Sequence, residues 1–253
     1  MRYALLICYN GARYGGWQIQ KNSNSVQAEL SRAIYKALGI SVNPVASGRT
    51  DAGVHARAQV CHFDGETSVP PERIADALNI HLPEDISVLK SALAPCGFHA
   101  SDSAKKKMYC YRAYAFSRRN PLKDINSAKI DFKLNLQTLK SVVQYFIGEH
   151  DFKAYCSSGS AVKTTVRTIY SIDVKISETE LGTDIELYFT GNGFLYNMVR
   201  TLAGTVFDCA AGRISEERIV KSLETGDRAL VGKTMPAHGL TLESVDYGIE
   251  IFK

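Results

Sequence analysis

The first ninety residues alternate between strand-like and helix-like apolar patterns, and this order limits the possible folds more than any other feature. Arg2–Tyr9 is short, apolar and aromatic, as expected of a strand. The next apolar side chains recur every four residues, on one stripe of a helix: Val26, Leu30, Ile34 and Leu38. We expect this helix to begin at Asn24 or Ser25 and to end before Gly39. With Asn24 as N-cap, Gln27 occupies the third helical position, which predicts a capping box.

The pattern continues with two strands, at Ile40–Val45 and Ala58–Phe63. A helix follows from Pro70–Pro71 to about Asn79, and Leu82–Leu89 then leads into another strand. The first half therefore reads β-α-β-β-α-β, which is the ferredoxin-like order.

The second half repeats this mixture with longer loops. The expected elements are a strand at Lys105–Phe116, a helix at Leu136–Ile147 ended by Gly148, an irregular stretch at Glu149–Tyr155, a loop at Ser157–Ser160, paired strands at Thr165–Ile176 and Thr183–Thr190, a helix carrying Phe194, Met198, Leu202 and Val206, a short helix capped by Ser215, and a last strand at Leu240–Tyr247. We predict an α+β fold with two halves, 1–103 and 104–253. They share one mixed, mostly antiparallel central sheet flanked by helices.

Composition excludes several classes of protein. Apolar residues make up 45% and charged residues 22%, as in ordinary soluble proteins. No apolar run approaches the roughly 20 residues of a membrane span, and the N-terminus lacks the pattern of a signal peptide, so we expect a cytoplasmic protein. The six cysteines are scattered without close pairs, which favours reduced thiols over zinc ligands or disulfides. The net charge of +4 permits a nucleic-acid partner without requiring one.

Asp51 is the first candidate for chemistry, because it lies in a polar loop between two strand-like runs. Gly48 and Gly53 bracket it and allow a turn with close approach of a ligand, and Arg49 lies two residues away. Thr50 and His55 can orient a carboxylate or contact a substrate. An aspartate between glycines is, however, also a common turn without catalytic function.

A second candidate region combines cations with aromatic rings on one strand. Lys105, Lys106 and Lys107 precede Tyr109, with further tyrosines beyond it. Such a strand suits RNA, because phosphates are neutralised and unstacked bases lie on the rings. The alternative is a half-exposed strand with solvated lysines. Arg13 is a loop cation that extends such a basic groove.

Arg200 lies near the start of an apolar helix, where a charge needs a partner. An arginine–carboxylate pair is the expected solution, and a snorkelling side chain is the alternative. Nucleotide-binding glycine motifs are absent from the sequence. An aspartic protease is disfavoured, because Asp-Ala-Gly occurs once and the adjacent Arg49 favours an ionised carboxylate.

Taken together, these motifs resemble the tRNA pseudouridine synthase A family almost from end to end. The most specific is Gly48-Arg-Thr-Asp-Ala-Gly-Val-His-Ala56. The others are Gly11–Gln20, Gln59, Leu82–Ile86, Phe98–Ala100 with the aromatic strand from Tyr109, Gly148–Phe152, Gly193–Gly204 and Pro236–Leu240.

The resemblance implies a pseudouridine synthase fold with an active-site cleft between the halves. It implies isomerisation of uridine to pseudouridine in the anticodon stem-loop of tRNA, at positions 38, 39 and 40, by a homodimer without cofactor or metal. Asp51 corresponds to the catalytic aspartate and Tyr109 to the tyrosine that stacks on the uracil. Arg200 corresponds to the residue that pairs with the aspartate, and Arg49 to the one that helps displace the base.

Asp51 can act as a nucleophile or as a base at the ribose, and the sequence leaves both open. Two other functions compete with the isomerase: an RNA-binding module without catalysis, and an aspartic-type hydrolase. Ser101 departs from the family's usual arginine and Met108 from a second basic residue before Tyr109. These changes allow a paralogue with narrowed site choice.

Overall fold

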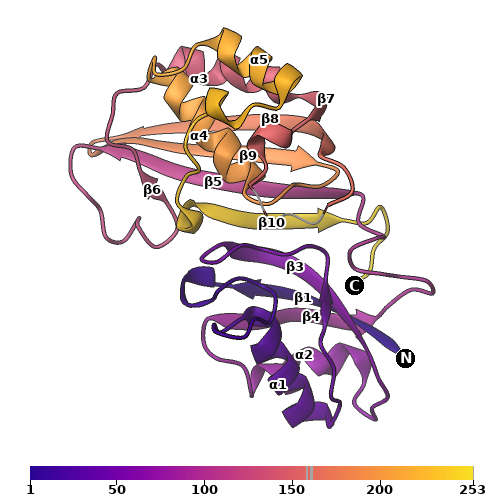
Figure 1. The fold of residues 1–253 in the computed structure, drawn as a ribbon. Helices are drawn as coiled ribbons and strands as arrows, with labels where there is room; N and C mark the ends of the chain where they lie inside the picture. The colour runs from indigo at the N-terminus through magenta and orange to yellow at the C-terminus, as the bar shows by residue number, and fades with distance from the viewer. Residues whose placement is uncertain (158, 160–161, 253) are drawn as a thin grey trace. The chain divides into compact units, whose positions relative to one another are not determined.

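The computed structural model describes residues 1–157, 159 and 162–252, and the chain divides into two compact units (Figure 1). The first unit comprises Met1–Lys107 and Leu242–Lys253, and the second comprises Met108–Thr241. The end of the chain thus belongs to the same unit as its beginning. The functional halves 1–103 and 104–253 remain a prediction.

The first unit confirms the predicted β-α-β-β-α-β order. Its elements are β1 (Arg2–Tyr9), α1 (Val26–Leu38), β2 (Val45–Ala46), β3 (His55–Asp64), α2 (Ile74–Asn79) and β4 (Ile86–Leu93), with 3-10 turns at Gly11–Arg13 and Pro71–Arg73. Strand β1 is antiparallel to both β3 and β4, and the short β2 is antiparallel to β3. Figure 1 shows α1 and α2 together beside this sheet.

The N-cap of α1 lies one residue after the predicted cap, Asn24. Ser25 is the N-cap, and its Oγ accepts the Ala28 N–H at 3.2 Å. The predicted capping box is wrong, because the Gln27 amide instead accepts the Ile19 N–H and donates to the Pro44 carbonyl. The predicted end is confirmed, with Gly39 in the left-handed conformation at φ 71°.

The strand predicted at Ile40–Val45 is mostly wrong. Only Val45–Ala46 pairs, because Pro44 has no N–H to donate and its carbonyl is bound by Gln27. On the other side of the Asp51 loop, β3 starts three residues before the predicted Ala58.

The second unit is also a sheet with helices. Its elements are β5 (Lys106–Phe116, which begins in the first unit), β6 (Ala128–Lys129), α3 (Leu136–Val142), β7 (Gly148–Asp151), β8 (Val166–Thr179), β9 (Gly182–Gly191), α4 (Met198–Ala210) and α5 (Glu216–Thr225). The last strand, β10 (Leu240–Asp246), begins in this unit and belongs to the first unit from Leu242 on. Further 3-10 turns lie at Val143–Phe146, Lys153–Tyr155, Arg228–Leu230 and Ala237–Gly239.

Within this unit the strand order is β5-β9-β8-β7. Strand β8 is antiparallel to β7 and β9, and β6 is parallel to β5. Helices α3, α4 and α5 cover one face of the sheet in Figure 1. The predicted pair of long strands is confirmed in β8 and β9. Ser215 occupies the N-cap position of α5 as predicted, but its side chain makes no capping hydrogen bond.

Three details of the second unit differ from expectation. The helix before Gly148 ends as a 3-10 turn, and part of the stretch expected to be irregular forms β7. Phe194 lies outside α4, because Asn197 starts that helix in the left-handed conformation. Of the predicted loop Ser157–Ser160, positions 158 and 160 lie outside the described residues.

The mixed α+β class is confirmed in both units. One continuous sheet and a cleft between the halves concern the relation of the two units, and they remain predictions. All six cysteines are free, as predicted. Among the described residues no helix is long and apolar enough to cross a bilayer.

Candidate active site

The backbone of the Asp51 loop lies directly on the glycine-rich segment that follows β1. A Cβ on Gly11 would lie 1.9 Å from the Val54 carbonyl oxygen, and one on Gly16 would lie 2.5 Å from that of Thr50. Gly16 also has a φ of 103°, which L side chains rarely adopt. Both positions therefore require glycine if the loop is to keep this place.

Hydrogen bonds fix the same contact on either side of Asp51. The Trp17 N–H donates to the Thr50 carbonyl at 3.0 Å, and the Gly53 N–H donates to the Tyr14 carbonyl at 3.2 Å. The Val54 N–H closes the turn on the Asp51 carbonyl at 3.1 Å. Asp51 itself is half-buried and opens this turn. Its backbone is thus held by residues more than thirty positions away.

Two buried side chains, Tyr9 and His55, form hydrogen bonds that hold the loop. The hydroxyls of Tyr9 and Thr50 share a hydrogen bond of 2.8 Å, and burial raises the pKa of Tyr9 to about 12, so the phenol stays neutral. The Gly11 N–H donates to Nδ1 of His55 at 3.1 Å, which places the proton of the neutral ring on Nε2. This contact supports a role of His55 in holding the loop. Direct contact of His55 with the substrate remains a prediction.

The start of the loop is tied to Gln59 and Lys107. Gln59 donates from Nε2 to the Gly48 carbonyl at 2.9 Å and accepts the Ser47 hydroxyl at 2.5 Å. Lys107 donates from Nζ to the Ser47 carbonyl at 2.6 Å. Of the three predicted RNA-contacting lysines, Lys107 thus holds the loop. Sequence reasoning missed the Ser47–Gln59 pair, although Gln59 belongs to the quoted motif.

The other predicted cations of the first unit lie at its surface. Arg49 is exposed and makes no hydrogen bond or ion pair with another described residue. The Arg13 side chain is 83% exposed, with Nη1 3.5 Å from Oδ2 of Asp85. Lys105 and Lys106 are also exposed. Exposure leaves these side chains accessible to a polyanion.

Tyr109 and Arg200 belong to the second unit. Tyr109 lies on β5 and is 8% exposed, and its ring meets Phe194 edge to face at a centroid distance of 5.3 Å. Arg200, on the first turn of α4, donates from Nε to the Met235 carbonyl at 2.7 Å and from Nη1 to Oδ1 of Asn197 at 2.6 Å. These two partners are neutral. The predicted pairing of Arg200 with a carboxylate therefore remains a prediction.

A segment before β10 is packed against α4 and supplies the Met235 carbonyl. A Cβ on Gly204 would lie 1.8 Å from the Lys233 carbonyl oxygen, so only glycine lets the segment lie there. The Gly232 N–H donates to the Thr205 hydroxyl at 2.9 Å, and the Met235 N–H to the Arg200 carbonyl at 3.2 Å. Sequence reasoning missed this segment. Its signal was Gly204, a glycine inside an apolar helix, which often marks close packing.

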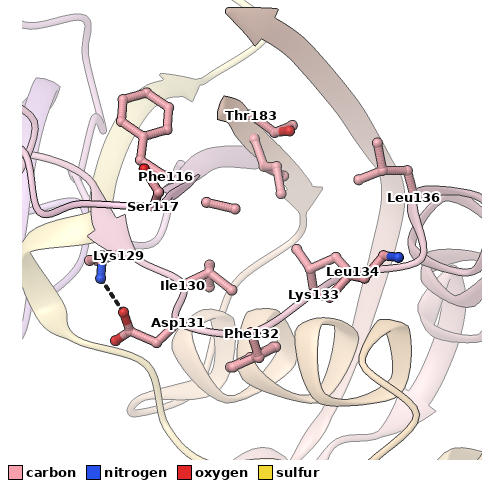
Figure 2. A pocket seen from close by; sticks show the side chains of 12 residues that line it. Phe116, Ser117, Lys129, Ile130, Asp131, Phe132, Lys133, Leu134, Leu136 and Thr183 are labelled. Carbon is pink, nitrogen blue, oxygen red and sulfur yellow. Dashed lines mark hydrogen bonds and ion pairs between the residues drawn. The ribbon is translucent and has the colours of Figure 1, made fainter. Parts of the chain in front are cut away.

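The cavity in Figure 2 carries none of the predicted chemistry. It has a volume of about 410 Å³ and lies in the second unit, between the ends of β5 and β9 and the chain from Lys129 to Leu136. Its visible polar contact is an ion pair of Lys129 with Asp131. Among the described residues no cluster of His, Cys, Asp and Glu side chains could hold a metal ion.

Comparison with known proteins assigns the chain to a family. The family model described as tRNA pseudouridine synthase matches residues 6–101 and 142–248. The tRNA pseudouridine synthase A of Bacillus subtilis is 41% identical over 250 residues, which cover 98% of this chain and 99% of that protein. That of Listeria innocua is 42% identical over 97% of this chain and 99% of its own. The chain belongs to the tRNA pseudouridine synthase A family.

The tRNA pseudouridine synthase activity of the family is an isomerisation of uridine to pseudouridine, and it agrees with the function expected from the sequence motifs. Asp51 and Arg200 lie inside the two matched stretches, and Tyr109 lies between them. A solved Cbf5-Nop10-Gar1 complex is 13% identical over 81% of this chain and 53% of that chain, with a TM-score of 0.36. A likeness at that level carries no argument about function.

Proposed function

We propose that the chain converts uridine to pseudouridine in the anticodon stem-loop of tRNA, at positions 38, 39 and 40, with Asp51 as the essential group. The observation that carries this proposal is the Asp51 loop. Its backbone is locked at Thr50, Gly53 and Val54, so that the carboxylate sits on a fixed turn. A reacting group benefits from such fixation, because no reorganisation is needed in the transition state.

The reaction needs no net gain or loss of atoms. The bond between ribose C1′ and uracil N1 breaks, the base turns, and C1′ bonds to C5, while a proton leaves C5 and N1 gains one. Asp51 acts at the ribose, either as a nucleophile at C1′ or as a base. In either role it must be ionised, and we propose that Arg200 pairs with it and keeps it so.

The target base must leave its stack before Asp51 can reach the ribose, at a cost of about a few kcal/mol. We assign to Tyr109 the stacking that partly offsets this cost, and to Arg49 the displacement of the base. The edge-to-face contact with Phe194 supports this assignment, because it fixes the plane of the Tyr109 ring.

We propose that Lys105, Lys106 and Arg13 contact the RNA backbone, since all three are exposed cations. Lys107 serves the same surface and also positions the Asp51 loop through Ser47. We further propose a homodimer that works without a cofactor in the cytoplasm, where its tRNA substrate is found.

The test is incubation with unmodified tRNA transcripts, followed by site-resolved mapping of pseudouridine. We expect wild-type protein to modify positions 38 to 40, and Asp51→Asn to form no pseudouridine while its affinity for tRNA stays within about threefold, since binding depends mainly on phosphate contacts. Asp76→Asn is the matched control, because Asp76 is an exposed carboxylate on α2 that pairs with Arg73, three residues earlier in the chain.

Three results would change the assignment. Near-normal turnover by Asp51→Asn removes Asp51 from the chemistry. Binding of tRNA by the wild type without any pseudouridine favours an RNA-binding module instead. Pseudouridine at other positions keeps the enzyme and moves its target, as for a paralogue with narrowed or shifted site choice.

A further inference from the structure

Asn197 has an unusual backbone conformation at the start of α4. Its φ is 61° and its ψ is 4°, and it is the only non-glycine residue with a positive φ in the part of the chain that the structure describes. Side chains with a Cβ are disfavoured there, although asparagine tolerates the region better than most. Such conformations persist where the surroundings impose them, and they concentrate at functional sites.

The side chain of Asn197 does not do what an N-cap asparagine usually does. At that position the side-chain oxygen commonly accepts an N–H of the first helical turn, and the backbone is extended. Here the amide makes no capping bond. Its Oδ1 instead accepts Nη1 of Arg200 at 2.6 Å, and its Nδ2 donates to the Ser157 hydroxyl at 2.9 Å.

These contacts orient the guanidinium of Arg200 from two sides. Asn197 binds Nη1, and the Met235 carbonyl binds Nε at 2.7 Å. The two partners come from segments 38 residues apart in sequence. Ser157 in turn holds the amide of Asn197, which keeps its oxygen directed at the arginine. A planar guanidinium bound at two nitrogens has a fixed plane.

We propose that Asn197 is a positioning residue for the isomerisation: it sets the orientation of Arg200, and α4 forgoes its usual N-terminal cap as a result. This inference rests on the proposed role of Arg200 beside Asp51. Because the amide binds Arg200 and does not cap α4, its removal should disturb the arginine and leave the end of the helix intact.

The test is Asn197→Gly, which removes the amide and relieves the left-handed backbone. We expect a thermal midpoint close to that of the wild type, because glycine adopts this conformation freely and this gain offsets the loss of the two side-chain hydrogen bonds. We expect kcat to fall about tenfold or more, as for loss of a hydrogen bond to a charged group, while KM for tRNA changes less than about threefold.

A matched control exists in the same unit. Asn135 caps α3 in the usual way, with Oδ1 accepting the N–H groups of Gln137 and Thr138. Asn135→Ala removes this cap, and it should lower the thermal midpoint and leave kcat unchanged, in contrast to the result expected at Asn197.

Coupling to Arg200 decides whether Asn197 acts through it. If it does, the double variant Asn197→Gly, Arg200→Gln is no slower than Arg200→Gln alone. Losses that multiply in the double variant overturn the inference. The inference is also overturned if Asn197→Gly keeps the wild-type kcat while Arg200→Gln is slow. In that case the proposed function still stands. Wild-type kcat in Arg200→Gln removes both the role of Arg200 and this inference.

Discussion

His62 gives the first unit a pH dependence of stability that follows from its surroundings. The residue lies in β3 and is 3% exposed, and its Nδ1 accepts the Ala100 N–H at 3.1 Å. The rings of Phe98 and His99 meet it edge-on. Burial, together with the positive charge of Arg2, lowers the pKa of His62 from 6.5 to about 4.

The sign follows from which state takes up the proton first. The folded chain disfavours the protonated ring, so the unfolded chain is protonated earlier as the pH falls. The free energy of unfolding that neutral His62 contributes is fully present above pH 6.5 and is lost as the pH falls from 6.5 to about 4. Below about pH 4 the free energy of unfolding no longer changes through His62. The shift from 6.5 to about 4 corresponds to a total of about 3 kcal/mol, of which about 2 kcal/mol is lost between pH 7.5 and pH 5.

The assay is urea denaturation at pH 7.5 and pH 5, followed by the fluorescence of Trp17. Trp17 is the one tryptophan in the sequence and is buried in the first unit, so it reports on that unit. His62→Asn keeps an acceptor near the Nδ1 position and does not titrate. Between the two pH values the wild type should lose about 2 kcal/mol more than this variant. Equal losses would refute the reasoning, because carboxyl groups contribute alike to both proteins.

Two further predictions concern the second unit. Gly204→Ala should displace the segment whose Lys233 carbonyl oxygen lies 1.8 Å from the new Cβ, lowering the free energy of unfolding by about 1–3 kcal/mol and slowing turnover. Gly212 has a positive φ and open space around it, so Gly212→Ala should lower the free energy of unfolding by about 1 kcal/mol and leave turnover unchanged. Similar urea midpoints and similar turnover rates for the two variants would contradict the packing argument. In tRNA turnover assays, Tyr109→Phe should keep most activity and Tyr109→Ala should lose far more, because the ring that packs on Phe194 is the stacking surface. Equal losses in the two variants would indicate that the hydroxyl is the essential group.

Local patterns in the sequence determined most of the secondary structure. The stripe of residues four apart predicted α1, and Gly39 marked its end, because glycine alone adopts the left-handed conformation without strain. The alternating runs that became β8 and β9 were predicted for the same kind of reason. Side-chain periodicity and turn chemistry act over a few residues, so a sequence displays them directly.

The predictions of secondary structure were wrong where a side chain expected to bind its own helix forms hydrogen bonds outside that helix instead. Gln27 was predicted to cap its own helix, but Pro44 and Ile19 bind its amide. Pro44 in turn left the predicted strand with only two paired residues. Such competition is decided by tertiary hydrogen bonds, which outweigh a local preference of about 1 kcal/mol.

For the candidate site, the sequence determined which residue types are present, and the motif around Asp51 carried the family. The tertiary structure alone decided how they are held. Lys107 reaches the Ser47 carbonyl across 60 residues, and Arg200 reaches that of Met235 across 35. Backbone carbonyls occur at every residue, so no pattern of side chains marks the ones that a folded chain brings to an arginine or a lysine. The left-handed conformation of Asn197 and its contact with Arg200 likewise have no marker in the sequence and appear only in the folded structure.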